Sequence, residues 1–383
     1  MKKSLLALAT MGAFAGAAQA QSSVTVYGIY DGGYSSSNTK ESVGATKTNS
    51  QTSGYTGAES ATSRIGFRGL EDLGGGLSAN FNLELGVTAG TGTVGVTTAT
   101  AGATQGSDSA SVRTSIVGIS SKEYGSLAVG RQTTGMHAIL AGDVWGGNNM
   151  AGDITYFGIA STAAGAGVTA SGRINFVTTR SSNMLTYTSP TLMGASVRLE
   201  QGNTEVTASN QPGIQFSVAG AYLTYTYGPI TAKVGQVKAK SNEAIAVGTI
   251  FSGTQTVVNG ANIMYKDKGL TAQYTIGSNK TEALTATATN FSSAVRAQKI
   301  SASYNLTPQI MPFVQYGRGG SEGVRTAANT TTDDSAYQMG VEYAMSKRTS
   351  LYGAYGVSQR ELKSNSANKT EVTDFAVGVR HTF

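Results

Sequence analysis

The chain has no cysteine among its 383 residues, and it holds only 5 prolines and 2 histidines. Without cysteine it forms neither disulfides nor thiolate metal sites. No stretch reaches about 18 consecutive apolar residues, so the sequence excludes a protein that crosses a membrane with helices. Charged residues are also scarce, at 13%. They form no cluster of lysine and arginine that would indicate a nucleic-acid partner.

Glycine and tyrosine are abundant instead. There are 50 glycines, and the 18 tyrosines outnumber the 11 phenylalanines. This composition favours strands and turns over helices. Only 39% of the residues are hydrophobic, which is compatible with a transmembrane β-barrel because half of each strand faces a wet lumen.

The first 20 residues have the pattern of an export signal. Lys2 and Lys3 provide a positive start, residues 5–18 are small and apolar, and Ala18-Gln19-Ala20 matches the cleavage pattern of signal peptidase. The sequence therefore predicts a signal peptide over residues 1–20 and a single mature domain over residues 21–383 that leaves the cytoplasm.

A β-hairpin with two different faces is predicted over residues 63–87. Ile65 and Phe67 alternate with Arg64 and Arg68, and the second arm continues this period of two. Residues 71–76 between the arms are rich in acidic residues and glycine, as a turn requires. Two strands cannot bury an apolar face alone, so many similar strands must share it.

The same rhythm continues along the chain, with short turns alternating with long polar loops, as in outer-membrane barrels. Three of the loops are expected at residues 35–61, 319–335 and 361–369. The sequence thus predicts an all-β fold, an antiparallel transmembrane β-barrel of about 16 strands. The last strand ends at Phe383 and is expected to pair with the first, which begins near Ser23, so that no edge remains open.

One connection, residues 134–179, is much longer than the others. It holds the only tryptophan, Trp145, and many glycines. Loops of more than about 15 residues are usually functional or disordered. The apolar content of this one predicts that it packs against another part of the protein.

Several motifs resemble the general porin family of Gram-negative outer membranes. They are SSVTVYGIYDGG, SRIGFRGLEDLGGGL, GSLAVGRQ, RSSNMLTYTSP and VGVRHTF, in this order along the mature chain. The resemblance implies a homotrimer, surrounded by outer-membrane lipid and lipopolysaccharide, that passes small hydrophilic solutes and ions. It also implies that residues 134–179 fold into the lumen as the third loop, and that the barrel-assembly machinery recognises the strand ending in Phe383.

The family sets basic residues of the barrel wall opposite acidic residues of the third loop. By motif, the resemblance places Arg64, Arg68, Arg113 and Arg180 on the wall, with Asp143 and Asp153 in the loop. Arg131 also belongs to a motif, but alternation with Leu127 and Val129 directs it outward unless a bulge intervenes. With so few loop acids, a mild preference for anions is expected. Other inward charges, such as Glu200, are expected to be solvated wall residues.

Two other functions compete with a non-specific channel. A substrate-specific channel would use Trp145, Tyr156 and Phe157 to stack on a sugar, but no staggered aromatic ladder favours this over packing of the loop. An outer-membrane hydrolase would need a base beside a nucleophile. His381 lies on the lipid-facing side of its strand, and His137 has no recognisable Ser/Asp partner. The sequence therefore predicts neither an enzyme nor a cofactor.

Overall fold

The fold is described from a computed structural model. It describes residues 23–57, 59–88, 93–94, 112–141, 144–145, 180–206, 214–241, 244–246, 249–251, 254–283, 292–325, 328–329, 331–363 and 365–383. The predicted signal peptide lies outside these residues. No helix in this part of the chain is long and apolar enough to cross a membrane.

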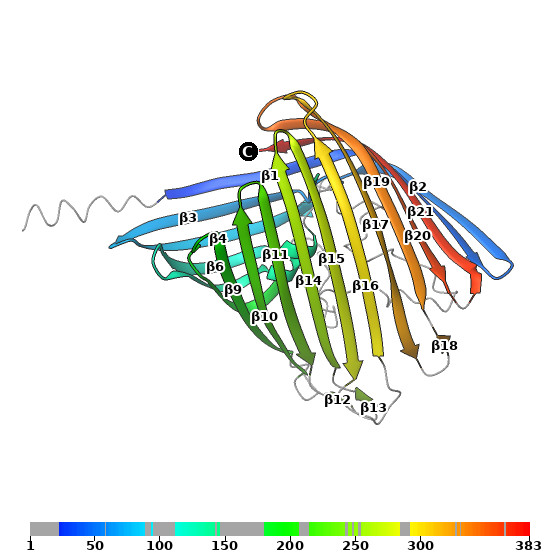
Figure 1. Ribbon diagram of the computed structural model, residues 1–383, viewed down its shortest axis with the longest axis horizontal. Helices are drawn as coiled ribbons and strands as arrows, with labels where there is room; N and C mark the ends of the chain where they lie inside the picture. Colours follow the sequence, from blue (N-terminus) through cyan, green and yellow to red (C-terminus); the bar gives the residue numbers. More distant parts are fainter. Residues whose placement is uncertain are drawn as a thin grey trace, which may run out of the picture.

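Sixteen antiparallel strands form a closed barrel (Figure 1). In chain order they are β1 (Ser23–Val43), β3 (Arg64–Gly74), β4 (Leu77–Thr88), β6 (Val112–Ser121), β7 (Gly125–Thr133), β8 (Arg180–Thr188), β9 (Ala195–Val206), β10 (Ile214–Tyr227), β11 (Ile230–Ser241), β14 (Thr254–Asp267), β15 (Leu270–Ala283), β16 (Ser292–Tyr304), β17 (Ile310–Arg325), β19 (Thr332–Ala344), β20 (Thr349–Leu362) and β21 (Asn365–Thr382). Each pairs with its neighbours in this order.

Short elements extend the loops at one end of the barrel. They are β2 (Thr46–Thr56), β5 (Thr93–Val94), β12 (Ala244–Ala246), β13 (Thr249–Phe251) and β18 (Ala328–Asn329). The helix α2 (Gly135–Leu140) follows β7 directly. The Thr134 side chain caps this helix by accepting a hydrogen bond of 3.3 Å from the backbone N–H of His137.

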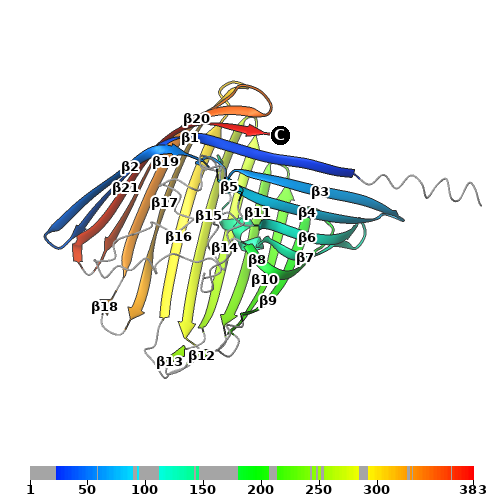
Figure 2. The ribbon, with the colours of Figure 1, turned by 180° about the vertical axis from the view of Figure 1, so that it is seen from behind.

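The first and last strands close the ring, as the sequence predicted. Ile29 of β1 is in register with Thr382 of β21. The backbone N–H of Gly28 donates to the carbonyl of Phe383 at 3.0 Å, and that of Phe383 donates to the carbonyl of Gly28 at 3.1 Å. The Phe383 ring covers Gly28 so closely that a Cβ at this position would overlap it. In Figures 1 and 2 the C-terminus accordingly lies beside β1.

The outer wall is an apolar belt produced by the two-residue alternation. Ile65 and Phe67 of β3 are in register with Gly28 and Val26 of β1. Val26 is exposed outside the barrel. Exposed aliphatic side chains continue this belt on the later strands. Exposed tyrosines lie on the same face beside the short turns, where amphipathic rings suit the membrane interface: Tyr225, Tyr227, Tyr265, Tyr304 and Tyr343.

The short turns between β3 and β4, between β6 and β7, and between the later pairs up to β19 and β20 lie at the end of the barrel that holds Ser23 and Phe383. The polar tracts at the other end correct the sequence-based interpretation. Residues 35–61, 319–335 and 361–369 were expected to be loops, but most of them continue strands: β1 runs on to pair with β2, β17 reaches Arg325, and β21 begins at Asn365. Above the lipid both faces of a strand meet water, so the backbone ladder continues after the apolar alternation ends.

Candidate functional site

Three arginines lie on the inner face of neighbouring strands. Arg64 and Arg68 of β3 alternate with the outward Ile65 and Phe67, and Arg68 is in register with Asn82 of β4. Arg113 reaches the same face by a different route. Arg113 is an even number of residues from the exposed Val117, so strict alternation would direct its side chain outward. A bulge beside Glu84, however, shifts the register between β4 and β6. Bulges commonly redirect a side chain in this way.

Glu84 connects two of these guanidinium groups. Arg113 Nε donates to Glu84 Oε1 at 2.7 Å, and a terminal nitrogen of Arg64 lies 4.0 Å from the same oxygen. The Tyr27 hydroxyl lies 2.8 Å from Asn82 Oδ1 and 3.2 Å from Glu84 Oε2. Within the described residues, Glu84 is the one carboxylate that contacts the arginine cluster, which consists of Arg64, Arg68 and Arg113.

Arg68 is the most open member of the cluster. Its guanidinium carbon lies 5.3 Å from the centre of the Tyr27 ring. Stacking on a ring leaves the charge unneutralised, because the ring offers a quadrupole and no counter-ion. With three arginines and one glutamate, the formal charge of the group is 3 − 1 = +2. The described part of this group is therefore net positive.

Arg131 is held apart from this cluster. It is in register with Ser115 of β6, on the side of the outward Val129. A register shift between β7 and β8 follows directly. Arg131 Nε donates to the Val112 carbonyl at 2.6 Å, and a terminal nitrogen donates to Ser182 Oγ at 3.1 Å. Its charge is thus engaged at the end of β6 and β8.

Arg180 is the first residue of β8 and pairs with Thr133, so it lies at the point where the long connection returns to the wall. The two acidic residues proposed to face the arginines, Asp143 and Asp153, lie outside the described residues, as do Tyr156 and Phe157.

The start of the long connection packs on the inner wall. Helix α2 buries Met136, Ile139 and Leu140 in a cluster with Tyr222 and Val237. Tyr222 alternates with the exposed Leu223 on β10, so the cluster lies inside the barrel. Burying each aliphatic side chain contributes about 1.5–3 kcal/mol. The sequence did not predict this helix, because its single apolar turn is too short to show a period.

Glu200 of β9 anchors the same helix. Its side chain is fully buried. One carboxylate oxygen accepts from the backbone N–H of Gly135 at 3.0 Å, and the other accepts from the Tyr222 hydroxyl. Arg198 lies 3.4 Å from Glu200 and donates to the Thr133 carbonyl at 2.7 Å. The expectation that Glu200 is a solvated wall residue was therefore wrong.

Replacing Glu200 by Ala should loosen the start of this connection. Gly135 would lose its acceptor, and a buried donor left unpaired costs about 1–3 kcal/mol. We expect more frequent current fluctuations in single-channel recordings, and milder ones for Glu200→Gln, which keeps an acceptor oxygen. Glu123→Ala removes an equal charge from an exposed turn, and its current fluctuations should equal those of the wild type. Current fluctuations no more frequent than in the wild type in both Glu200 variants would contradict the role of Glu200 in anchoring the helix.

Trp145 forms a second contact with the inner wall. Its ring stacks on Phe313 at a centroid distance of 4.3 Å and meets Tyr352 edge-on at 5.5 Å. The ring is only 5% exposed. Trp145 therefore serves packing of the loop, the alternative that the sequence favoured over sugar stacking.

Beneath this contact, Asp31 fastens the chain before β3. Its carboxylate accepts from the backbone N–H groups of Ser60 at 2.8 Å and Ala61 at 2.7 Å, and from the Tyr352 hydroxyl at 2.7 Å. Asp31 is fully buried. No sequence pattern pointed to it, since its partners are distant in the chain.

The order of the strands sets part of helix α2 opposite the arginine cluster. In the ring of 16, strands β14 to β16 stand eight positions from β3, β4 and β6. Helix α2 contacts β10 to β15, which include strands opposite the arginines, whereas Trp145 packs on β17 and β20, further round the ring towards β1.

A family model described as "Gram-negative porin" matches residues 5–361. The chain belongs to the Gram-negative porins. Outer membrane porin protein 32 of Delftia acidovorans is 28% identical over 100% of both chains. An outer membrane porin of Bordetella pertussis is 33% identical over 64% of this chain and 62% of its own.

Solved structures show the same fold. An anion-selective porin from Comamonas acidovorans superposes with a TM-score of 0.69, at 22% identity over 95% of this porin and 100% of that chain. OmpF of Salmonella typhi gives 0.60 at 15% identity, over 94% and 97%. This porin is therefore a channel of the outer membrane for passive diffusion, and belongs to a family of channels rather than enzymes.

Proposed function

We propose that this porin passes small hydrophilic solutes and ions with a mild preference for anions. The observation that carries the proposal is the arginine cluster, in which Glu84 compensates only part of the charge of three guanidinium groups. The description of the Comamonas acidovorans porin as anion-selective agrees with it.

The constriction consists of the arginine cluster on one side and residues 134–179 on the other. The contacts of helix α2 with β14 and β15 support this arrangement, because these strands stand opposite β3 and β4 in the ring. Asp143 and Asp153 face the arginines across the gap. Arg180 and Arg131 contribute charge where the connection leaves and rejoins the wall.

The reversal potential of the wild-type channel in a KCl gradient tests the proposal. Anion preference gives a potential displaced towards the equilibrium potential of chloride. A potential displaced towards that of potassium would contradict it.

The porin assembles as a homotrimer, surrounded by lipid and lipopolysaccharide, after removal of residues 1–20. Its relatives are porins of the outer membrane, which supports this assembly and location. The barrel-assembly machinery recognises the strand that ends in Phe383, a residue that is exposed outside the barrel and completes the closing ladder.

Phe383→Asp should therefore reduce the amount of folded porin in the outer membrane strongly, because it sets a charge in the lipid-facing belt and alters the recognised end. The channels that do form should conduct as the wild type, since the residue faces away from the lumen. The amount of folded porin in the outer membrane, measured by heat-modifiability on gels, tests the first effect. Phe383→Tyr is the matched control. Normal levels of Phe383→Asp would refute the role in assembly.

A further inference from the structure

The chain turns into the lumen between β2 and β3. Strand β1 pairs with β3 over its first residues and with β2 over its later ones, and Asp31 lies in the interval between the two ladders. Ser63 fills this interval. Its Oγ accepts from the backbone N–H of Asp31 at 2.9 Å and donates to the carbonyl of the same residue at 3.1 Å. Asp31 alternates with the exposed Tyr30, so its carboxylate meets residues 59–63 on the inner side of the wall.

This segment determines where the first arginine of the cluster begins. Ser63 directly precedes Arg64. The Ser63 carbonyl accepts from the backbone N–H of Val87 on β4 at 2.9 Å, so Ser63 joins β1 to β4. One carboxylate oxygen of Asp31 holds the earlier part of the segment through the two backbone N–H groups of residues 60–61. Arg64 therefore follows a backbone that is fixed on both sides.

The other carboxylate oxygen of Asp31 reaches across a whole strand. It accepts from the hydroxyl of Tyr352 on β20 at 2.7 Å, although β21 lies between β20 and β1. Gly378 of β21 makes this contact possible, because a Cβ at that position would overlap the Tyr352 hydroxyl. The Tyr352 ring in turn meets Trp145 edge-on. One carboxylate thus touches the chain before Arg64 and the ring on which Trp145 packs.

Burial makes these bonds necessary. Asp31 and Ser60 are fully buried, and Tyr352 is nearly so. The nearest compensation comes from Arg380, which is in register with Asp31, donates to Ser60 Oγ at 2.7 Å and pairs with Glu342. A buried carboxylate is retained only where hydrogen bonds and nearby positive charge compensate its loss of water. Both sets of donors are therefore needed.

We propose that Asp31 is a positioning residue for both sides of the constriction. It fixes the start of the strand that carries Arg64, and it holds the ring against which Trp145 of the long connection is seated. Strands β20, β21, β1 and β3 are consecutive in the ring, so the two sides meet at this carboxylate. Asp31 is fully buried, and it acts through these groups rather than on the ions.

The test compares two substitutions that remove the same charge. Asp31→Ala leaves the buried donors of residues 60–61 and Tyr352 without an acceptor, which shifts the equilibrium between the held and the released segment about tenfold for each lost bond. Asp31→Asn keeps the arrangement, since its amide oxygen accepts from the two backbone N–H groups and its NH₂ group donates to the Tyr352 hydroxyl.

The first readout is the fluorescence of Trp145, the only tryptophan of the chain. In the folded porin in detergent, Asp31→Ala should shift its emission to the red and raise its quenching by acrylamide. Asp31→Asn should emit and quench as the wild type. Tyr352→Phe, which keeps the ring and loses the bond to Asp31, should also raise the quenching.

The second readout, the reversal potential in a low-salt KCl gradient, rests on the proposed anion preference. Loss of a negative charge alone would strengthen that preference, whereas a displaced Arg64 weakens it. Asp31→Ala should therefore give a potential less displaced towards that of chloride than Asp31→Asn. A wild-type channel without anion preference would refute the proposed function, while the fluorescence of Trp145 would still test the role of Asp31.

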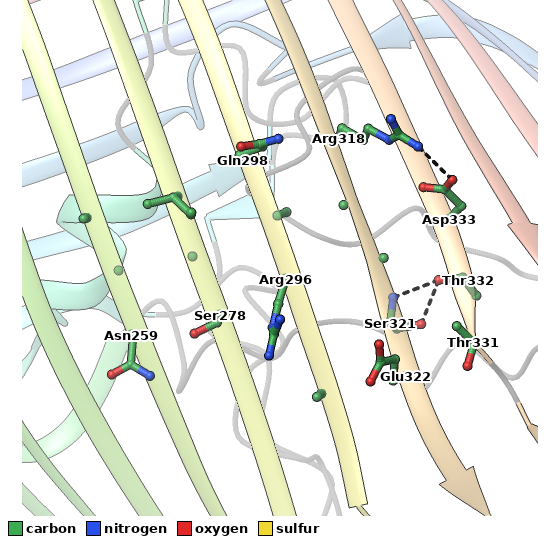
Figure 3. Close-up of a pocket in the computed structure, with 18 of the residues that line it drawn as sticks. Asn259, Ser278, Arg296, Gln298, Arg318, Ser321, Glu322, Thr331, Thr332 and Asp333 are labelled. Atoms are coloured by element: carbon green, nitrogen blue, oxygen red, sulfur yellow. Dashed lines mark hydrogen bonds and ion pairs between the residues drawn. The ribbon is translucent and has the colours of Figure 1, made fainter.

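Asp333→Ala is the matched control. Asp333 of β19 pairs with Arg318 of β17 at 3.2 Å (Figure 3), and it alternates to the outer face with the exposed Tyr337. Its loss removes one acid from an ion pair that faces away from the lumen. Both readouts should equal those of the wild type.

Two results would overturn the proposal. Equal potentials for Asp31→Ala and Asp31→Asn would mean that Asp31 does not position Arg64. Wild-type quenching of Trp145 in folded Asp31→Ala, even with a lower unfolding temperature, would reduce Asp31 to a structural role. If Asp31→Ala yields no folded porin, Ser63→Ala should weaken the anion preference alone and Tyr352→Phe should raise the quenching alone. Wild-type readouts in both would equally overturn it.

Discussion

Arg64→Glu combined with Arg113→Glu should reverse the ion preference of the pore. With Arg68 and Glu84 unchanged, the formal charge of the group would move from 3 − 1 = +2 to 1 − 3 = −2. A unit charge about 5 Å from a passing ion contributes about 0.8 kcal/mol in bulk water and about 3 kcal/mol at an effective dielectric constant near 20. Since about 1.4 kcal/mol corresponds to a tenfold ratio, the reversal potential should change sign in a low-salt KCl gradient.

The dependence on salt and on charge distinguishes this effect from a structural one. The shift should shrink as salt rises, because the Debye length falls from about 10 Å at 0.1 M to about 3 Å at 1 M. The double variant Arg64→Gln with Arg113→Gln leaves the group with a formal charge of zero. Its reversal potential should lie midway between those of the wild type and the double Glu variant. Lys122→Glu with Lys268→Glu makes the same change of charge at exposed turns and should shift the potential much less. An unmoved potential at low salt in the double Glu variant would place the selective charges elsewhere.

Replacing residues 134–179 by a short Gly/Ser linker should widen the pore. Strands β7 and β8 pair with each other and with β6 and β9, so the barrel does not depend on the segment for its ladder. A helix with its side chains is about 10–12 Å across, a large part of the lumen of a barrel of this strand number, and single-channel conductance should rise about twofold or more.

The deletion also exposes the apolar cluster around Tyr222 and Val237 to water in the lumen. The barrel should therefore unfold at a lower temperature than the wild type while still forming. Shortening residues 242–253, whose strands β12 and β13 pair only with each other in the described structure, should leave conductance unchanged. Wild-type conductance in the larger deletion would show that the segment does not occupy the channel.

The sequence predicted those parts of the porin whose side chains meet lipid on one face and water on the other. In β3 this contrast set Ile65 apart from Arg64, and the structure confirms both orientations. The prediction failed where the contrast ends. Residues 46–56 form β2 with a polar composition throughout, because neither face of that strand touches lipid and the backbone hydrogen bonds alone define it.

The arginines show a second limit, which is set by bulges. Counting alternate residues directs both Arg113 and Arg131 outward, yet the extra residue beside Glu84 turns Arg113 to the lumen while Arg131 binds the Val112 carbonyl. A bulge follows from the register of three strands together. Glu200 was missed for a related reason: its partner Gly135 is 65 positions away, and nothing in its local pattern distinguishes a buried acceptor from a solvated wall residue.

The pairing of Gly28 with Phe383 bears on when the porin can fold. Every other barrel ladder joins strands that are neighbours in the order of synthesis, whereas this one spans 383 − 28 = 355 residues. Closing a flexible loop of that length costs about 5 kcal/mol in chain entropy before the ladder compensates it, and such non-local contacts form slowly. An emerging N-terminal part therefore has an unpaired edge until β21 has been exported. The chain must be protected in transit, and a truncation that removes β21 leaves an open sheet rather than a smaller pore.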